Sequence, residues 1–126
     1  MKKISVLIVE DEAIVAFDLA TQLKSRGFSV AGITGYGEDV LSIVSNDHVD
    51  LILLDIRLKG SLTGIDVARS IEEFSSARII FLTALGDGET ATYIKQHPHF
   101  SLIRKPFNSE DLFIEIEHTL KILSTN

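Results

Sequence analysis

The chain has 126 residues, a formal net charge of -6 and no cysteine, and 45% of its residues are hydrophobic. This length fits a single domain, residues 1–126, and the composition is that of a folded protein. The negative charge argues against direct nucleic-acid binding, and the lack of cysteine excludes disulfide bonds and thiolate metal sites. No signal peptide or membrane-spanning run is evident, so we expect a cytoplasmic protein without membrane contact.

Five short apolar segments, rich in β-branched residues, predict strands. Along the chain they are residues 4–9, 28–34, 51–54, 78–83 and 101–104. Their apolar residues run continuously instead of alternating with polar ones. This pattern is typical of strands that are covered on both faces.

Helices are predicted between the strands. Apolar residues recur at helical spacing in three sets: Ala16, Leu19, Ala20 and Leu23; Val67, Ala68, Ile71 and Phe74; Leu112, Ile116, Leu120 and Leu123. Gly27 can end the first of these helices, and Asn108 or Ser109 can cap the last. Residues 38–45 and 87–96 are predicted to be helical from their positions between strands.

The alternation of strands and helices predicts an α/β fold of five βα units, (βα)5. Strict alternation implies a doubly wound, parallel, five-stranded sheet with helices on both faces. In such sheets, ligands bind outside the carboxyl ends of the strands. The residues that follow each predicted strand are therefore the candidates for a functional site.

Polar residues stand at four of these strand ends. They are Glu10 and Asp11, Asp55, Thr83 and Lys105. Each alone is usually a helix cap or a solvated charge, but together they suit a single site. Clustered carboxylates repel one another, and a hard cation such as Mg²⁺ relieves that repulsion. A cation, an ammonium and a hydroxyl suit a phosphoryl group, with Asp55 as the nucleophile.

Four segments carry a family resemblance: VLIVEDE at 6–12, LILLDIRL at 51–58, IFLTA at 80–84 and RKPF at 104–107. In order and spacing they resemble the receiver domains of two-component response regulators, over essentially the whole chain. The resemblance implies a flavodoxin-like strand order of 2-1-3-4-5. It also implies a signalling switch in a phosphorelay, not an enzyme of metabolism. The phosphoryl donor would be a histidine kinase or a histidine phosphotransfer domain, and the sequence does not identify the output partner.

The resemblance assigns roles around a magnesium ion. Asp55 is the phosphoacceptor and a metal ligand. Asp11 binds Mg²⁺ directly, Glu10 acts mostly through metal-bound water, and the backbone carbonyl of Arg57 is a further ligand. The segment from Asp55 to Gly64 is one residue longer than in the commonest receivers.

The resemblance also assigns the contacts of the phosphoryl group. Thr83 and Lys105 hold its oxygens, and the peptide bond from Lys105 to Pro106 is cis. Leu102 stands where receivers usually carry the Tyr or Phe of an aromatic switch. Phe100 lies two residues earlier, and regular alternation predicts that it shares a face with Leu102 and partly replaces the missing ring.

Two other functions were weighed against this one. A pseudo-receiver, which binds partners without phosphorylation, is disfavoured because the acidic residues, Thr83 and Lys105 are all present. A flavodoxin-like cofactor binder needs a phosphate-binding first loop, and the acidic residues at 10–12 would repel the phosphate.

Two further features lie outside the proposed site, and the first of them allows two interpretations. Ile14 and Phe17 lie off the apolar stripe of the first helix, so they are either partly buried by neighbouring loops or part of a docking patch for a kinase or phosphotransfer domain. Gly35-Tyr36-Gly37 lacks the spacing of phosphate-binding loops and is interpreted as a turn.

Overall fold

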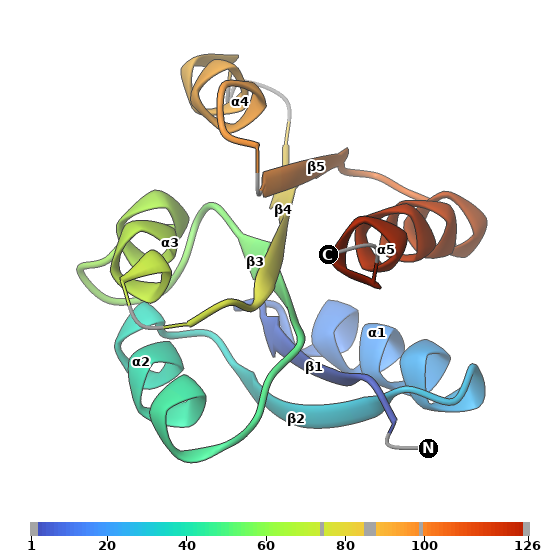
Figure 1. Ribbon diagram of the computed structural model, residues 1–126. Coiled ribbons are helices and arrows are strands. Elements are labelled where there is room, and N and C mark those ends of the chain that lie inside the picture. The colour runs from blue at the N-terminus through green and yellow to red at the C-terminus, as the bar shows by residue number, and fades with distance from the viewer. Residues whose placement is uncertain (1–2, 74, 85–87, 99, 125–126) are drawn as a thin grey trace.

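The structure is a computed structural model that describes residues 3–73, 75–84, 88–98 and 100–124. Strands and helices alternate along this part of the chain (Figure 1). The strands are β1 (Ser5–Val9), β2 (Ser29–Thr34), β3 (Leu51–Asp55), β4 (Arg78–Thr83) and β5 (Phe100–Arg104). The helices are α1 (Ala13–Ser25), α2 (Gly37–Asn46), α3 (Gly64–Glu72), α4 (Gly88–Lys95) and α5 (Ser109–Ser124).

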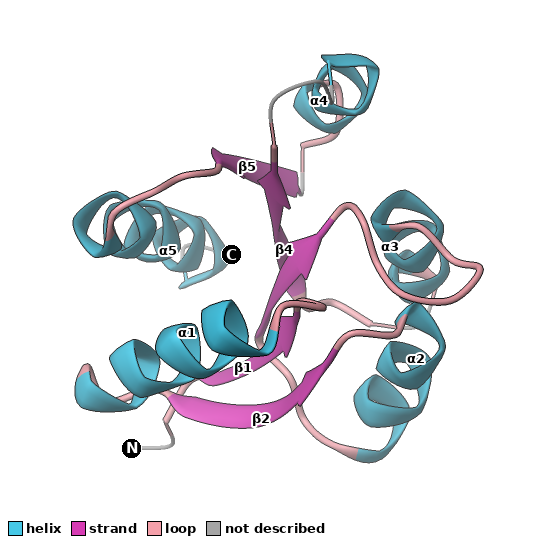
Figure 2. Ribbon diagram, turned by 180° about the vertical axis from the view of Figure 1, so that it is seen from behind, coloured by secondary structure: helices cyan, strands magenta, loops and turns pink. Residues whose placement is uncertain are grey.

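The five strands form one parallel sheet in the order β2-β1-β3-β4-β5. This arrangement confirms the predicted fold class and strand order. Because all strands run in the same direction, their carboxyl ends meet at one edge of the sheet (Figure 2). Strand β1 pairs with β2 on one side and with β3 on the other, so the ends of β1 and β3 lie next to each other.

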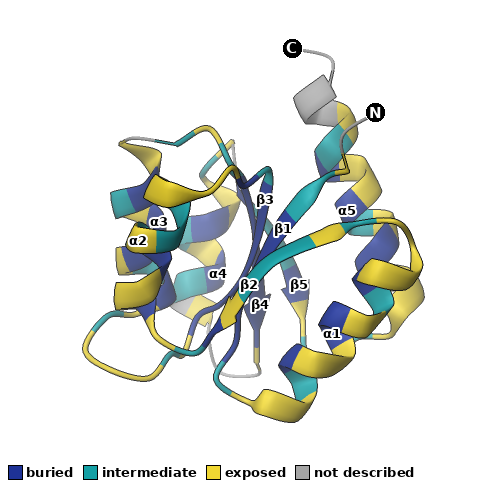
Figure 3. Cartoon of the chain, turned by 90° about the horizontal axis from the view of Figure 1, so that it is seen from below, coloured by how far each residue is buried: buried dark blue, intermediate teal, exposed yellow. Residues whose placement is uncertain are grey.

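Helices cover both faces of the sheet. Helices α1 and α5 lie on one face, and α2, α3 and α4 lie on the other (Figure 3). Along β1, Val6 and Ile8 pack into the cluster under α1 and α5, whereas Leu7 and Val9 pack into the cluster under the other three helices. Successive side chains of a strand point to opposite faces, so two covered faces explain the continuous apolar runs.

Most predicted boundaries agree with the structure to within a residue or two. Gly27, just after α1, has a φ of +90°, and Asn108 caps α5 by accepting a 2.7 Å hydrogen bond from the Asp111 amide. At the strand ends, β3 includes Asp55 and β5 begins at Phe100, whereas β1 and β2 each begin one residue later than predicted. Phe74, predicted on the third helix, lies outside the described residues. Within the described ranges, no helix has the length and apolar character needed to cross a bilayer.

Candidate functional site

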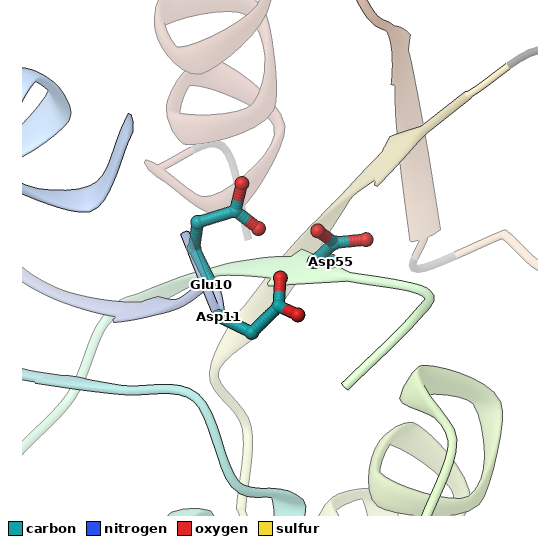
Figure 4. A group of neighbouring side chains, drawn as sticks. All are labelled: Glu10, Asp11 and Asp55. Carbon is teal, nitrogen blue, oxygen red and sulfur yellow. The ribbon is translucent and has the colours of Figure 1, made fainter. Parts of the chain in front are cut away.

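Three carboxylates meet at the carboxyl edge of the sheet. Glu10 and Asp11 follow β1, and Asp55 ends the neighbouring strand β3. One carboxylate oxygen from each of the three lies within 4.8 Å of the others, and the side chains gather around one point (Figure 4). Glu10 is 2% exposed and Asp55 is 7% exposed, so two of these acidic groups are buried.

Lys105 bridges two of the carboxylates. Its Nζ lies 2.8 Å from Glu10 Oε1 and 2.9 Å from Asp55 Oδ2. Its backbone amide donates a 2.6 Å hydrogen bond to the Thr83 carbonyl, which fixes the start of the β5–α5 loop at the end of β4. The peptide bond between Lys105 and Pro106 is cis. The ammonium therefore reaches the acidic cluster from two strands away.

Thr83 and Arg57 complete the set of predicted residues. Thr83 is the buried last residue of β4, one position beyond the residue that pairs with Asp55 in the sheet. The Arg57 amide donates a 3.0 Å hydrogen bond to Asp55 Oδ1. The structure thus brings the predicted residues to one edge, with the loop after β3 folded back on the Asp55 carboxylate.

Burial and mutual contact set the charges of this cluster. Burial raises the pKa of Glu10 to about 8, helped by a hydrogen bond with Asp55 and opposed by Lys105. Burial also acts to raise the pKa of Asp55, but hydrogen bonds with Glu10, Lys105 and the Arg57 amide outweigh it and lower that pKa. Burial acts to lower the pKa of Lys105, and its bonds to the two carboxyl groups raise it instead. The raised pKa of Glu10 beside the lowered pKa of Asp55 favours a proton on Glu10 when the cluster holds no cation.

The donor set fits a hard divalent cation. All the side-chain donors of the cluster are oxygens, which Mg²⁺ prefers. Glu10 Oε2 is buried and has no hydrogen-bond partner among the described residues. A buried polar atom without a partner is costly, and a nearby cation or a water bound to that cation would satisfy it.

The loop after β3 is held against the site by close backbone contacts. A Cβ added to Gly64 would lie 2.6 Å from the Asp55 carbonyl oxygen and 2.9 Å from Ile56 Cα, so only glycine fits there. Gly60 has a φ of +85°, which also favours glycine. Sequence reasoning did not identify Gly64 as part of the site. The signal was the glycine at the end of the loop, whose close approach is visible only in the structure.

The loop after β3 also pairs with the turn after β2. The Lys59 amide donates a 2.9 Å hydrogen bond to the Gly35 carbonyl, and Tyr36 and Lys59 form an isolated parallel bridge. The Lys59 ammonium lies 6.0 Å from the centre of the Tyr36 ring. The loop after β3 is therefore tied to the turn after β2.

Phe100 and Leu102 lie in the same core cluster, as alternation along β5 predicts. Leu102 is partly buried and pairs with Phe81 across the sheet. The Phe100 ring meets the Phe81 ring edge-on at 5.2 Å and stacks on His97 at 4.2 Å. The Phe100 ring is therefore packed in the core. It lies two residues before Leu102, which occupies the position where receivers usually carry their switch residue.

Helix α1 presents apolar side chains beside the site. Ile14 is 86% exposed and Phe17 is 66% exposed, so the interpretation of partial burial was wrong. Both side chains are thus largely open to solvent, and none of the described loops buries them. A groove of 660 Å³ borders this surface, and Ile14, Phe107 and Lys105 are among its lining residues. The groove thus extends from the exposed Ile14 side chain to Lys105, whose ammonium bonds to Glu10 and Asp55.

Comparison with known proteins identifies the family. The family model described as "Response regulator receiver domain" matches residues 6–117. The chain belongs to this family. This match confirms the family that the four sequence segments suggested.

The receiver domain resembles part of two longer proteins. It is 31% identical over 112 residues to the "Transcriptional regulatory protein PdtaR" of Mycobacterium tuberculosis, covering 89% of this chain and 54% of that protein. It is 33% identical over 116 residues to the "DNA-binding response regulator MtrA" of Mycobacterium leprae, covering 92% and 51%. The chain therefore spans about half the length of these relatives. The second name describes DNA binding by the longer protein, and it stands against our prediction of no nucleic-acid contact unless that contact lies outside the matched half.

Solved receiver structures share the fold over nearly their whole length. The signal receiver domain of a modulated diguanylate cyclase from Desulfovibrio desulfuricans G20 matches with a TM-score of 0.85 and 32% identity, covering 95% of both chains. The receiver domain of the response regulator PhyR from Erythrobacter litoralis matches with a TM-score of 0.83 and 27% identity, covering 95% of this chain and 92% of that one.

Proposed function

We propose that this receiver domain accepts a phosphoryl group on Asp55 from a phosphohistidine in a histidine kinase or phosphotransfer domain, in a Mg²⁺-dependent reaction. The observation that carries the proposal is the cluster of three carboxylates at the ligand-binding edge, with Lys105 paired to two of them. Such a site suits a cation and an anionic phosphoryl group, and it repels a free anionic cofactor. Phosphorylation then changes the binding of an output partner.

The chemistry follows from the groups at the edge. An Asp55 carboxylate oxygen forms a bond to phosphorus while the bond from phosphorus to the donor imidazole nitrogen breaks, and the electron pair stays on that nitrogen. Mg²⁺, held by Asp11, Asp55 and the Arg57 carbonyl with Glu10 behind a water, would supply neutralising charge. Lys105 would pair with one phosphoryl oxygen and the Thr83 hydroxyl would donate to another. Water later removes the group, so the domain assists both steps without metabolic turnover.

The groove beside α1 supports a docking role for that helix. Exposed Ile14 and Phe17 offer apolar surface, and the groove leads to Lys105 next to the proposed phosphoacceptor. A phosphodonor helix seated there would present its histidine to Asp55. We therefore place the kinase or phosphotransfer partner on α1 and the β5–α5 loop.

The switch would differ from that of aromatic-switch receivers. Leu102 has no ring that could move, and the Phe100 ring packs between the rings of Phe81 and His97. We propose that phosphorylation moves Thr83 and the following loop, residues 84–88, of which 85–87 lie outside the described residues. The rearrangement on the face formed by α4, β5 and α5 would be smaller than in aromatic-switch receivers. Backbone amide shifts with and without Mg²⁺ and a phosphoryl analogue test this. Changes at Leu102 and along α5 as large as those at 84–88 would refute it.

A phosphorylation assay tests the function directly. The chain is incubated with acetyl phosphate, with Mg²⁺ or with a chelator, and its intact mass is measured. We expect one added phosphoryl group only with Mg²⁺, and none in Asp55→Asn. Label in Asp55→Asn would show that another residue is the acceptor. No label in the wild-type chain would favour the pseudo-receiver alternative.

Docking is tested separately with a phosphotransfer domain that carries phosphohistidine and that phosphorylates the wild-type chain. Ile14→Asp should slow this transfer while leaving the reaction with acetyl phosphate intact. Ile114→Asp is the matched control, because Ile114 is an exposed isoleucine on α5 that does not line the groove. Equal transfer to Ile14→Asp and to wild type would remove α1 from the docking surface.

A further inference from the structure

The turn after β2 lies directly against the loop that carries Asp11. A Cβ added to Gly35 would lie 3.0 Å from Asp11 Cα and 3.3 Å from Asp11 Cβ. Gly35 does not have a positive φ, so its backbone conformation alone does not require glycine. The closeness of Asp11 favours it instead. Any larger residue at this position must displace the Asp11 backbone by a few tenths of an ångström, or move itself.

Gly35 also contacts the loop after β3. The Gly35 carbonyl accepts the 2.9 Å hydrogen bond from the Lys59 amide, and Lys59 lies two residues after Arg57 in the loop that begins at Asp55. Gly35 therefore contacts both segments that carry proposed metal ligands. On one side it touches the backbone of Asp11, and on the other it anchors the loop that contains the Arg57 carbonyl.

The turn itself is anchored to the sheet through Thr34. The buried Thr34 hydroxyl donates a 2.8 Å hydrogen bond to Asp39 Oδ2 and accepts a 3.1 Å hydrogen bond from the Tyr36 amide. The Thr34 carbonyl accepts a 2.9 Å hydrogen bond from the Glu10 amide. Because hydrogen bonds join the turn to α2 and to the end of β1, its position is fixed relative to the two loops that it contacts.

We propose that Gly35 is a positioning residue, which sets the spacing between Asp11 and the loop carrying the Arg57 carbonyl, and thereby favours Mg²⁺ over Ca²⁺. Mg²⁺ needs a near-ideal octahedron with ligands at about 2.0–2.1 Å, whereas Ca²⁺ accepts about 2.3–2.6 Å in flexible geometry. A displacement of a few tenths of an ångström therefore penalises the smaller ion more. This inference rests on the proposed metal site.

The test is calorimetric titration of the metal-free chain with MgCl₂ and with CaCl₂. In Gly35→Ala, we expect the Kd for Mg²⁺ to rise about tenfold and the Kd for Ca²⁺ to rise less than about threefold, in line with the effect of removing a support for metal ligands. Gly32→Ala is the matched control in β2. Its added Cβ would lie 3.6 Å from a Leu7 carbon and 3.7 Å from an Ile43 carbon, which is ordinary packing, so both Kd values should stay as in wild type.

Three outcomes separate the interpretations. If wild type does not bind Mg²⁺, the proposed function fails, and this inference fails with it. If wild type binds Mg²⁺ and Gly35→Ala binds it equally well, or loses both metals to the same extent, only the positioning role is overturned. If Gly35→Ala does not fold, Thr34→Val decides, because it loosens the turn without adding an atom beside Asp11. It should lower the preference for Mg²⁺, and an unchanged preference overturns the proposal.

Discussion

Raising the pH of the metal-free receiver domain from about 5 to about 9 should destabilise it, because of Glu10. An unperturbed glutamate carboxyl group has a pKa of 4.5, whereas burial raises the pKa of Glu10 to about 8 in the folded chain. Between these values, the folded chain holds a proton that the unfolded chain has lost. The free energy of unfolding therefore falls as the pH rises through this window and levels off above it.

The size of the effect follows from the same pKa. One pKa unit corresponds to about 1.4 kcal/mol, which sets an upper bound of about 5 kcal/mol for Glu10. We expect about 2 kcal/mol, since the Lys105 side chain beside Glu10 is 22% exposed and water at this edge screens the charge. Asp55 has a lowered pKa, so its contribution is lost only in acid, and the raised pKa of Lys105 acts only in strong base.

Urea unfolding in the presence of a chelator measures this dependence across the pH window. Glu10→Gln keeps the shape of the side chain but does not titrate, so its stability should stay flat and exceed that of wild type at the alkaline end. Added Mg²⁺ should reduce the alkaline loss in wild type, because a cation stabilises the deprotonated cluster. A flat wild-type profile, or an equal slope in wild type and Glu10→Gln, would refute the assignment of the shared proton to Glu10.

Three further substitutions test the site and its loop. Lys105→Ala should leave Mg²⁺ binding largely in place and slow phosphorylation by acetyl phosphate about a hundredfold, as measured by intact mass, because it removes a charged contact to the transferred group. Gly64→Ala should lower the free energy of unfolding by about 3 kcal/mol, because its Cβ would collide with the backbone of Asp55. Thr63→Ala should lower it by about 1 kcal/mol, since the Thr63 hydroxyl and Asp66 form the capping box of α3. Urea unfolding measures both stabilities.

For each of these variants, one outcome would contradict the expectation. A wild-type phosphorylation rate in Lys105→Ala would remove that ammonium from the phosphoryl site. Unchanged stability in Gly64→Ala would show that the loop after β3 yields without cost. Thr63→Ser serves as the control for the cap, because it keeps the hydroxyl. It should keep most of the stability that Thr63→Ala loses.

The fold and the members of the acidic cluster could be predicted because both depend on local pattern. Continuous apolar runs mark strands with two covered faces, and the carboxyl-edge rule then brings Glu10, Asp55 and Lys105 together. Their sharing of charge could not be predicted in the same way. It depends on distances below 3 Å between Lys105 and the two carboxylates, and on the depth at which Glu10 is buried.

Close backbone contacts were also beyond the sequence. Gly35 and Tyr36 lie in the turn between β2 and α2, as predicted, whereas Gly37 already begins α2. The contact of Gly35 with Asp11 joins segments that are distant in the chain, and no local pattern reports it. The exposure of Ile14 and Phe17 depends on which loops pass over α1. Propensity and periodicity describe one element at a time, so they are silent on such neighbours.

The position of Tyr36 beside Lys59 also makes tyrosine fluorescence a useful probe of this molecule. The chain has no tryptophan and two tyrosines. Tyr36 lies beside Gly35 with the Lys59 ammonium 6.0 Å from its ring, whereas Tyr93 lies on α4 and accepts a 3.2 Å hydrogen bond from Arg69. Each tyrosine therefore reports on a different end of the proposed signal. Tyr93→Phe leaves Tyr36 as the one tyrosine, in the turn that lies against the Asp11 loop, and Tyr36→Phe leaves Tyr93 on α4, where its hydroxyl meets Arg69 of α3, so fluorescence can follow either place in an unlabelled chain.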